Sequence, residues 1–369
     1  MFPGRLTRYI MGQVAGGLLL ALAIILAMTV VVDFVELSRT VGTRAQVSPL
    51  SLFYLALMRA PSFVEVTLPF IFLFGVMWSM FRLNRRSELV VMRAAGVSAW
   101  RFIGPAVALS LVLGAGATTV LNPAGARLTA EFERQRASLL ASGQATIGVS
   151  EEGVWLREAR ADSQLVINAP RTEEGGRRLV SPTLYFYDLN GDAPPQFSRR
   201  IDAAEGVLRA GFWQLEDAWE TDPDPDSLPI QHASIAIPTS HVAEGLLETL
   251  GAPETQSFWN LRRQARLLRE AGFSASAYDL HWHQLLAMPL SLIAMTVVAA
   301  AASLRLARRG GAFQLAAIGA AVGFLLFFAK SFLAALATTG VMPIGLAAWA
   351  APAFTLLGGL FIIATVEDG

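Results

Sequence analysis

Six long apolar runs constrain this chain more than any other feature, because each approaches or exceeds the roughly 20 residues that cross a bilayer as a helix. The runs cover about Ile10–Val32, Phe63–Phe81, Phe102–Leu121, Gln284–Leu304, Phe313–Ala337 and Ile344–Ala364, and the second extends back toward Leu52. Only 16% of the residues are charged, whereas soluble domains carry roughly 25%. The sequence therefore predicts an α-helical polytopic membrane protein with six transmembrane helices, three on each side of a long polar insert.

The arginines predict the orientation of these helices, since arginine favours short loops that are not moved across the membrane. Arginines gather before the first run (Arg5–Arg8), between the second and third (Arg82–Arg101) and between the fourth and fifth (Arg305–Arg309). The connection Thr338–Pro343 carries no charge and falls on the opposite side, together with the insert Asn122–Asp279. Both chain ends and the arginine-rich loops are therefore expected to be cytoplasmic, with the insert on the outer side.

The polar insert is long enough to form a domain of its own. The sequence therefore predicts three parts: residues 1–121, the inserted domain at 122–278, and residues 279–369. It begins with helical spacing at Ala124–Leu140 and ends with another helical pattern at Ser257–Ala271. Between these helices, short β-like runs alternate with turn residues. The runs are Gly153–Arg157, Gln164–Asn168, Thr183–Asp188, Gly206–Arg209, Trp213–Leu215 and Ala233–Ile237. Many short strands at such spacing favour a sandwich, a jelly roll or an open barrel.

The stretch Arg82–Arg101 is a short amphipathic segment with five arginines between two expected spans. Ser87 can cap a short helix here, and Glu88 then stands in the first turn, where the helix dipole favours negative charge. Gly96 can end the helix in the left-handed conformation. A helix held below the membrane by two spans is suited to docking a partner, and the simpler interpretation is an ordinary charged loop.

The composition excludes several kinds of chemistry. The chain has no cysteine, so thiolate metal sites, disulfides and thiol nucleophiles are excluded. Its only lysine, Lys330, lies in an apolar run, so the chain has no glycine-rich phosphate-binding loop. A net charge of +0 argues against a general nucleic-acid binder. His281 and His283 are two residues apart and do not share a helix face, which argues against a metal pair. We therefore expect no metal, cofactor or catalytic site in this chain.

Ionisable residues at membrane depth form a second candidate site, because they are costly there and usually face a cavity or a partner. Lys330 lies about 27 Å from the inner end of its span at about 1.5 Å per residue, which is level with the outer end of the first span. The residues expected at this outer rim are Asp33, Glu36, Arg39, Arg44, Arg59 and Lys330. Such a collar can meet the head group of an anionic amphiphile. The alternative is snorkelling and local ion pairing with Asp33, Glu36 and Glu65.

Four stretches resemble the LptF/LptG (YjgP/YjgQ) permease family, the membrane subunits of the ABC exporter that extracts lipopolysaccharide from the inner membrane. They are V-D-F-V-E at Val32–Glu36, R-S-E-L with A-A-G-V-S at residues 86–98, S-F-W-N-L at Ser257–Leu261, and the region from Pro343 to Pro352. Together with the expected topology, the resemblance covers the whole chain.

The resemblance implies a Gram-negative inner-membrane protein with six transmembrane helices and a periplasmic β-jellyroll. It implies that the helix at about 87–96 docks into an LptB-like ATPase dimer, which would bind ATP and Mg, so that this chain is non-catalytic. The coupling residues would be Glu88, Leu89, Met92, Arg93 and Gly96. An LptF-like permease would complete a heterodimer whose cavity takes lipopolysaccharide through gates near the rim residues, and LptC-like and LptA-like periplasmic proteins would receive it.

Three alternatives stay open. The first-span ending D-F-V-E-L-S-R is more similar to LptG than to LptF, and the paralogous LptF is the alternative within the family. A polytopic membrane enzyme would have to use Asp33, Glu36 and His281, which no motif ties together. A membrane-anchored scaffold would have the same architecture, but it would not depend on an ATPase.

Overall fold

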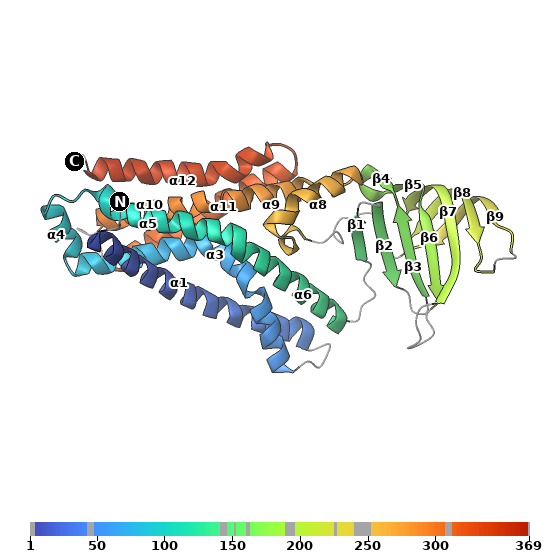
Figure 1. The fold of residues 1–369 in the computed structure, drawn as a ribbon, viewed down its shortest axis with the longest axis horizontal. Coiled ribbons are helices and arrows are strands. Elements are labelled where there is room, and N and C mark those ends of the chain that lie inside the picture. Colours follow the sequence, from blue (N-terminus) through green and yellow to red (C-terminus); the bar gives the residue numbers. More distant parts are fainter. Residues whose placement is uncertain are drawn as a thin grey trace. The chain divides into compact units, whose positions relative to one another are not determined.

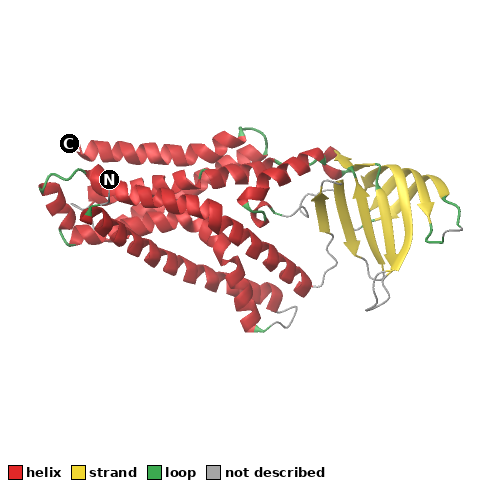
Figure 2. Cartoon of the chain, viewed as in Figure 1, coloured by secondary structure: helices red, strands yellow, loops and turns green. Residues whose placement is uncertain are grey.

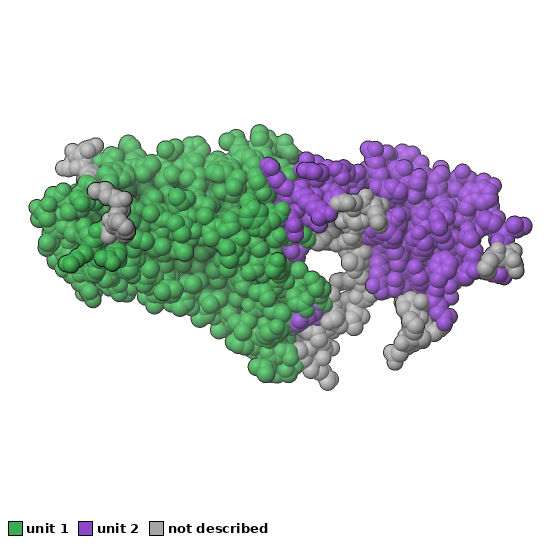
Figure 3. All heavy atoms as spheres, in the orientation of Figure 1, with its two compact units in different colours: residues 1–134, 256–259, 279–369 green, residues 135–255, 260–278 purple. Residues whose placement is uncertain are grey.

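The computed structural model describes residues 4–42, 48–140, 146–150, 153–159, 163–188, 196–224, 227–239, 252–306 and 312–367. The chain divides into two compact units (Figure 3). The helical unit contains residues 1–134, 256–259 and 279–369, and the sheet unit contains residues 135–255 and 260–278. The polar insert therefore folds mostly apart from the apolar runs, although the first part of its leading helix belongs to the helical unit.

The apolar runs form long helices. The helices are α1 (Arg5–Leu37) followed by the π-helix η1 (Ser38–Gly42), α3 (Pro49–Arg85), α4 (Glu88–Ala94), α5 (Ala99–Gly116) followed by the π-helix η2 (Ala117–Leu121), α6 (Asn122–Leu140), α8 (Phe258–Glu270), α9 (Ser276–Leu286), α10 (Met288–Leu306), α11 (Ala312–Thr338) and α12 (Ile344–Glu367). Within the described residues, five helices are long and apolar enough to cross a membrane, or six if the bent pair α9–α10 is one span. The start of α1, the end of α12 and α4 lie at one end of the helical unit (Figure 1).

The second span begins well before its most apolar stretch, as the run toward Leu52 indicated. Pro49 is the first residue of α3, where its missing N–H costs nothing because the first helical amides have no partner in the helix. Ser48 caps this end, since its Oγ accepts a hydrogen bond from the Ser51 amide at 3.2 Å.

The fourth span is bent by 49° between α9 and α10. Pro289 explains the bend, because it has no N–H to donate to the carbonyl of Leu285, four residues earlier. The hydroxyl of Thr118 on η2 donates to that carbonyl instead, at 2.8 Å. A backbone acceptor freed by proline in the membrane is thus satisfied by a neighbouring helix.

Helices α1 and α3 cross at glycines. A Cβ atom on Gly17 would lie inside contact distance of the Gly75 carbonyl oxygen and the Ser79 hydroxyl, and one on Gly75 would lie 2.8 Å from the Cα of Leu18. The Ser79 hydroxyl, which is fully buried, donates to the backbone carbonyl of Gln13 at 2.9 Å. Small residues and hydroxyl hydrogen bonds of this kind hold helices together in lipid, where the hydrophobic effect does not.

The sheet unit contains one antiparallel sheet, which has nine strands in the part of the chain that the structure describes (Figure 2). The strands are β1 (Thr146–Ser150), β2 (Gly153–Ala159), β3 (Ser163–Ala169), β4 (Arg171–Glu173), β5 (Arg178–Val180), β6 (Thr183–Asp188), β7 (Gln196–Arg209), β8 (Phe212–Thr221) and β9 (Ile230–Pro238). Strands that are neighbours in the sequence mostly pair, and β7 pairs with β6 and β5 on one edge and with β8 on the other.

Alternating burial explains why these segments form strands. In β6 the side chains of Leu184 and Phe186 are buried, whereas the residues on either side of them are more exposed. Leu165 and Ile167 on β3 and Trp213 on β8 are buried in the same way. The structure confirms the predicted fold class: a mostly helical protein with membrane-length helices and an inserted antiparallel sheet domain.

Candidate functional site

Helix α4 is the short helix predicted between the second and third spans, and its C-terminal end is formed by Gly96. Gly96 has a φ of 79°. Its amide donates to the Arg93 carbonyl and the Val97 amide donates to the Met92 carbonyl, both at 3.0 Å. These two bonds are a Schellman motif, which satisfies carbonyls at the end of a helix. The predicted stop at Gly96 is confirmed.

The prediction that Ser87 caps α4 is wrong. Ser87 precedes the helix but its side chain makes no capping hydrogen bond to the described residues. Its φ is 59°, in the left-handed region, whereas a capping residue has extended backbone angles that bring its side chain back to the helical amides. The Ser87 amide donates to the Asn84 carbonyl at 2.8 Å, so Ser87 forms the turn between α3 and α4.

The expected coupling residues divide between two faces of α4. Leu89 is only 3% exposed and Met92 packs against the same core, so these two residues hold α4 on the helical unit. Val90 and Val91, which the sequence analysis did not select, are 60% and 65% exposed. Glu88 is partly exposed, and its Oε2 accepts a hydrogen bond from the Tyr9 hydroxyl at 2.7 Å. The part of α4 available to a partner therefore includes two valines beside a carboxylate, and Arg93 in the last turn is partly exposed.

At the expected rim, the structure brings Asp33 and Arg59 together. Arg59 Nη1 donates to Asp33 Oδ1 at 2.8 Å, and the side chain of Asp33 is only 5% exposed. The Arg59 guanidinium also lies over the rings of Phe63 and Phe132, at 4.9 and 5.1 Å from their centroids. Arg59 thus links α1, α3 and α6 through one ion pair and two cation–π contacts.

The other rim residues are more scattered. Glu36 and Arg39 are exposed, on α1 and η1 respectively, and Arg44 lies outside the described residues. Lys330 is partly buried on α11, and the charge of Glu65 on α3 acts on its ammonium group. The structure therefore pairs one rim cation, Arg59, with Asp33, and the charge of Glu65 acts on a second rim cation, Lys330.

Asn122 connects Glu65 to the helix that returns from the insert. Its Nδ2 donates to both oxygens of Glu65, at 3.1 and 3.3 Å, and its Oδ1 accepts from the Phe258 amide at 2.7 Å. The Phe258 ring stacks on Trp282, with 6.0 Å between centroids and 7° between planes. Asn122 was not among the predicted site residues, since its partners Glu65 and Phe258 are distant in the sequence.

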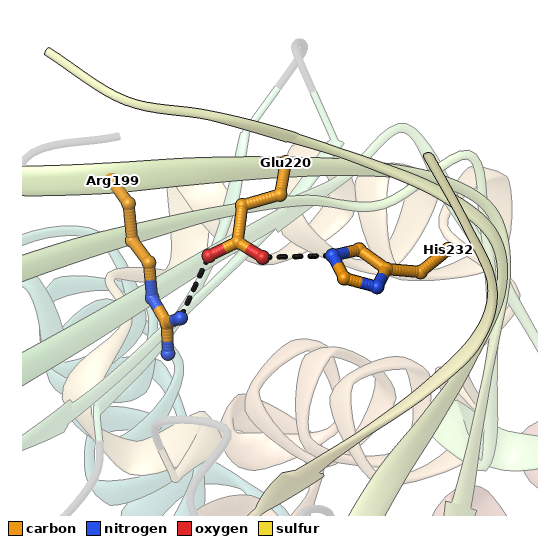
Figure 4. Close-up of polar contacts among 3 residues, drawn as sticks. All are labelled: Arg199, Glu220 and His232. Atoms are coloured by element: carbon orange, nitrogen blue, oxygen red, sulfur yellow. Dashed lines mark hydrogen bonds and ion pairs between the residues drawn. The ribbon is translucent and has the colours of Figure 1, made fainter. Parts of the chain in front are cut away.

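The sheet unit carries a separate charged cluster of Arg199 on β7, Glu220 on β8 and His232 on β9 (Figure 4). Arg199 Nη1 lies 2.7 Å from Glu220 Oε1, and His232 Nε2 lies 2.9 Å from Glu220 Oε2. Burial by itself would raise the pKa of Glu220, but the hydrogen bonds from Arg199 and His232 outweigh it, and the pKa falls below the ordinary value of 4.5. The cluster ties three neighbouring strands together.

This lowered pKa predicts how the sheet depends on pH. A carboxyl group with a lower pKa in the folded state stabilises it at pH values above its unfolded pKa, and this stabilisation is lost as the pH falls through the folded value. We expect Glu220→Gln to speed hydrogen exchange of the β8 and β9 amides at neutral pH. The increase should correspond to a loss of about 1–2 kcal/mol in the free energy of opening these strands. The difference from the parent should shrink as the pH falls below about 4.5.

Hydrogen–deuterium exchange of the full chain, corrected for the intrinsic effect of pH on exchange, measures this difference. Glu216→Gln is the matched control, because Glu216 is exposed on the same strand. Equal protection of β8 in Glu220→Gln and the parent at neutral pH would contradict the prediction.

The described residues contain no group of three or more histidine, cysteine or acidic side chains that could hold a metal ion. His281 and His283 lie on α9, where His283 is in edge contact with Trp282, with 4.9 Å between the ring centroids. Asp33, one of the three residues that an enzyme would have to use, is engaged by Arg59.

The helical unit and the inserted sheet define a class: a multi-pass membrane protein in which an antiparallel sheet domain is inserted in the sequence between two sets of membrane-length helices. The family model described as "Lipopolysaccharide export system permease LptF/LptG" matches residues 8–365, and the chain belongs to this family. The resemblance noted in the sequence is thereby confirmed.

Two relatives carry the same family assignment in their names. The chain is 25% identical over 352 residues to the lipopolysaccharide export system permease protein LptG of Haemophilus influenzae, with 89% of each chain covered. It is 22% identical over 311 residues to the protein of that name from Escherichia coli K12, with 80% of each covered.

Proposed function

We propose that this chain is an LptG-type permease subunit of a lipopolysaccharide exporter in the Gram-negative inner membrane. It takes lipopolysaccharide from the outer leaflet and passes it to a periplasmic bridge of LptC-like and LptA-like proteins. The observation that carries the proposal is the family match over nearly the whole chain. The names of both relatives favour LptG over the paralogous LptF.

Helix α4 couples ATP hydrolysis by a partner subunit to transport. The chain has no phosphate-binding loop, because its only lysine is Lys330. An LptB-like ATPase dimer therefore binds ATP and Mg and contacts the exposed face of α4, at Val90 and Val91 beside Glu88. In this arrangement α4 and both chain ends are cytoplasmic, and the sheet unit is periplasmic.

The outer rim receives the anionic head group. Arg59 and Lys330 supply the positive charge, together with Arg39 and Arg44. An LptF-like permease completes the cavity, and it packs against large exposed apolar side chains of the helices, such as Phe324 and Leu325.

Copurification tests the proposal. We expect the tagged full chain, extracted from native membranes in mild detergent, to carry one LptF-like permease and two copies of an ATPase, as measured by quantitative mass spectrometry. A scaffold would carry no ATPase. Recovery of the chain alone, or only with a second copy of itself, would contradict the assignment.

A further inference from the structure

Glu65 is a buried carboxylate held in place by a neutral group. It is 9% exposed, and Asn122, which is 3% exposed, donates to both of its oxygens. Asn122 is itself held by the Phe258 amide. An amide supplies hydrogen bonds but no charge, and a buried carboxylate remains costly without a cation nearby. The position of Glu65 is thus set by Asn122.

Lys330 on α11 is the cation that helix packing brings to the level of Glu65. Helix α11 approaches α3 closely, because Cβ atoms on Gly319 and Gly323 would lie 2.7 Å from Met77 Sδ and 2.8 Å from Phe70 Cε1. The later glycine of α11, Gly323, contacts the earlier residue of α3, Phe70, so the two helices are antiparallel. Lys330, about two turns beyond Gly323, therefore comes level with Glu65. The carboxylate of Glu65 acts electrostatically on Lys330. Lysine has a flexible four-carbon stem, so its ammonium group can move to another anion.

Arg59 and Asp33 form a second set of a cation and a buried acid. The side chain of Arg59 is 34% exposed, whereas that of Asp33 is 5% exposed, and Arg59 Nη1 lies 2.8 Å from Asp33 Oδ1. In both cases the acid is buried and the nearby cation is more accessible than the acid. An incoming anionic head group would reach the two cations first and would have to compete with the two acids for them.

We propose that Glu65 and Asp33 are internal counter-ions that compete with the anionic head group for Lys330 and Arg59. This inference rests on the proposed function, because it takes the substrate to be a phosphate-bearing glycolipid. While the rim is empty, the acids neutralise the cations. When a phosphate binds, it displaces the carboxylates, and when the lipid moves on, the carboxylates take the cations back. The acids therefore weaken binding and speed release.

The inference predicts opposite effects for the two members of each pair. We expect Glu65→Gln, which keeps an acceptor for Asn122 but removes the charge, to bind bisphosphorylated lipid A more tightly by roughly fivefold, near the lower end of couplings between competing ligands. Asp33→Asn should act in the same direction. Lys330→Ala and Arg59→Ala should bind it more weakly. If the acids only maintained the fold, all four variants would weaken binding.

The measurement is the dissociation constant and release rate of radiolabelled lipid A with the purified full chain and its copurifying partners in detergent. Dephosphorylated lipid A is the ligand control, and Glu131→Gln, an exposed acid on α6, is the protein control. Thermal unfolding identifies variants that fold as the parent does. If Glu65→Gln does not fold, Asp33→Asn decides the question.

The outcomes separate this inference from the proposed function. Tighter binding and slower release in folded Glu65→Gln or Asp33→Asn support the counter-ion role. Unchanged or weaker binding in these variants, with a parent that prefers phosphorylated lipid A, overturns that role and leaves the proposed function standing. A parent with no preference for phosphorylated lipid A overturns both.

Discussion

Glu88→Ala is expected to reduce ATP-driven lipopolysaccharide export roughly tenfold or more while the chain stays inserted and folded. Glu88 stands in the first turn of α4, beside the exposed Val90 and Val91. A carboxylate that becomes buried against a partner contributes strongly, because truncating one member of a buried charge pair costs about 2–5 kcal/mol. Charge reversal at Arg93, in the last turn of α4, should act in the same direction. Transport and ATP hydrolysis by the reconstituted complex in proteoliposomes measure the effect.

Tyr9→Phe is the matched control for Glu88→Ala. It removes the hydrogen bond that Tyr9 donates to Glu88 but leaves the carboxylate in place for the ATPase. Export in Tyr9→Phe should stay near that of the parent. If Tyr9→Phe lost as much export as Glu88→Ala, the role of Glu88 would lie within the chain, and unchanged export in Glu88→Ala would reject the coupling assignment.

The second large effect is expected from Gly17→Leu, which should greatly reduce the yield of folded protein. A side chain at Gly17 meets the backbone of α3 at Gly75 and the buried hydroxyl of Ser79. The helices would have to separate, because backbone cannot rotate away as a flexible side chain does. Overpacking costs about 1–3 kcal/mol or more, and the hydrogen bond from Ser79 to the Gln13 carbonyl would be lost as well. Size-exclusion chromatography and thermal unfolding in detergent measure the loss.

Gly16→Leu gives a closely matched comparison. Gly16 precedes Gly17 on the same helix, but it is exposed, and a Cβ there meets no described atom within 4 Å. The variant should fold as the parent does. Similar losses at both positions would mean that glycine itself, and not the crossing with α3, is required.

The features that could be predicted from the sequence are those that depend on short stretches of chain. Apolar length predicts the spans, alternation predicts the core of most strands, and Gly96 ends α4 because a single residue determines its backbone conformation. The short strands β1, β4 and β5 and the polar first half of β7 were missed, since pairing with neighbouring strands, and not their own pattern, holds them.

The contacts at the candidate site depend on residues that are far apart in the sequence. Glu65 and Asn122 are 57 positions apart, and Thr118 and Leu285 are 167 apart. No local pattern shows that a hydroxyl on η2 completes the backbone at Pro289, or that one amide holds Glu65. Asp33 and Arg59 were both selected from their charge and depth, and local ion pairing with Asp33 was the alternative for the rim, but the fold alone shows that Arg59 is the cation that pairs with it.

The burial of Leu89 has a mechanical consequence. Leu89 belongs to the same core as Ile10 on α1, Leu83 on α3 and Phe102 on α5. Because a packed core is stiff, a force that displaces α4 moves the adjoining ends of three long helices with it. A displacement of this helix of about two turns is therefore passed directly to the ends of α1, α3 and α5.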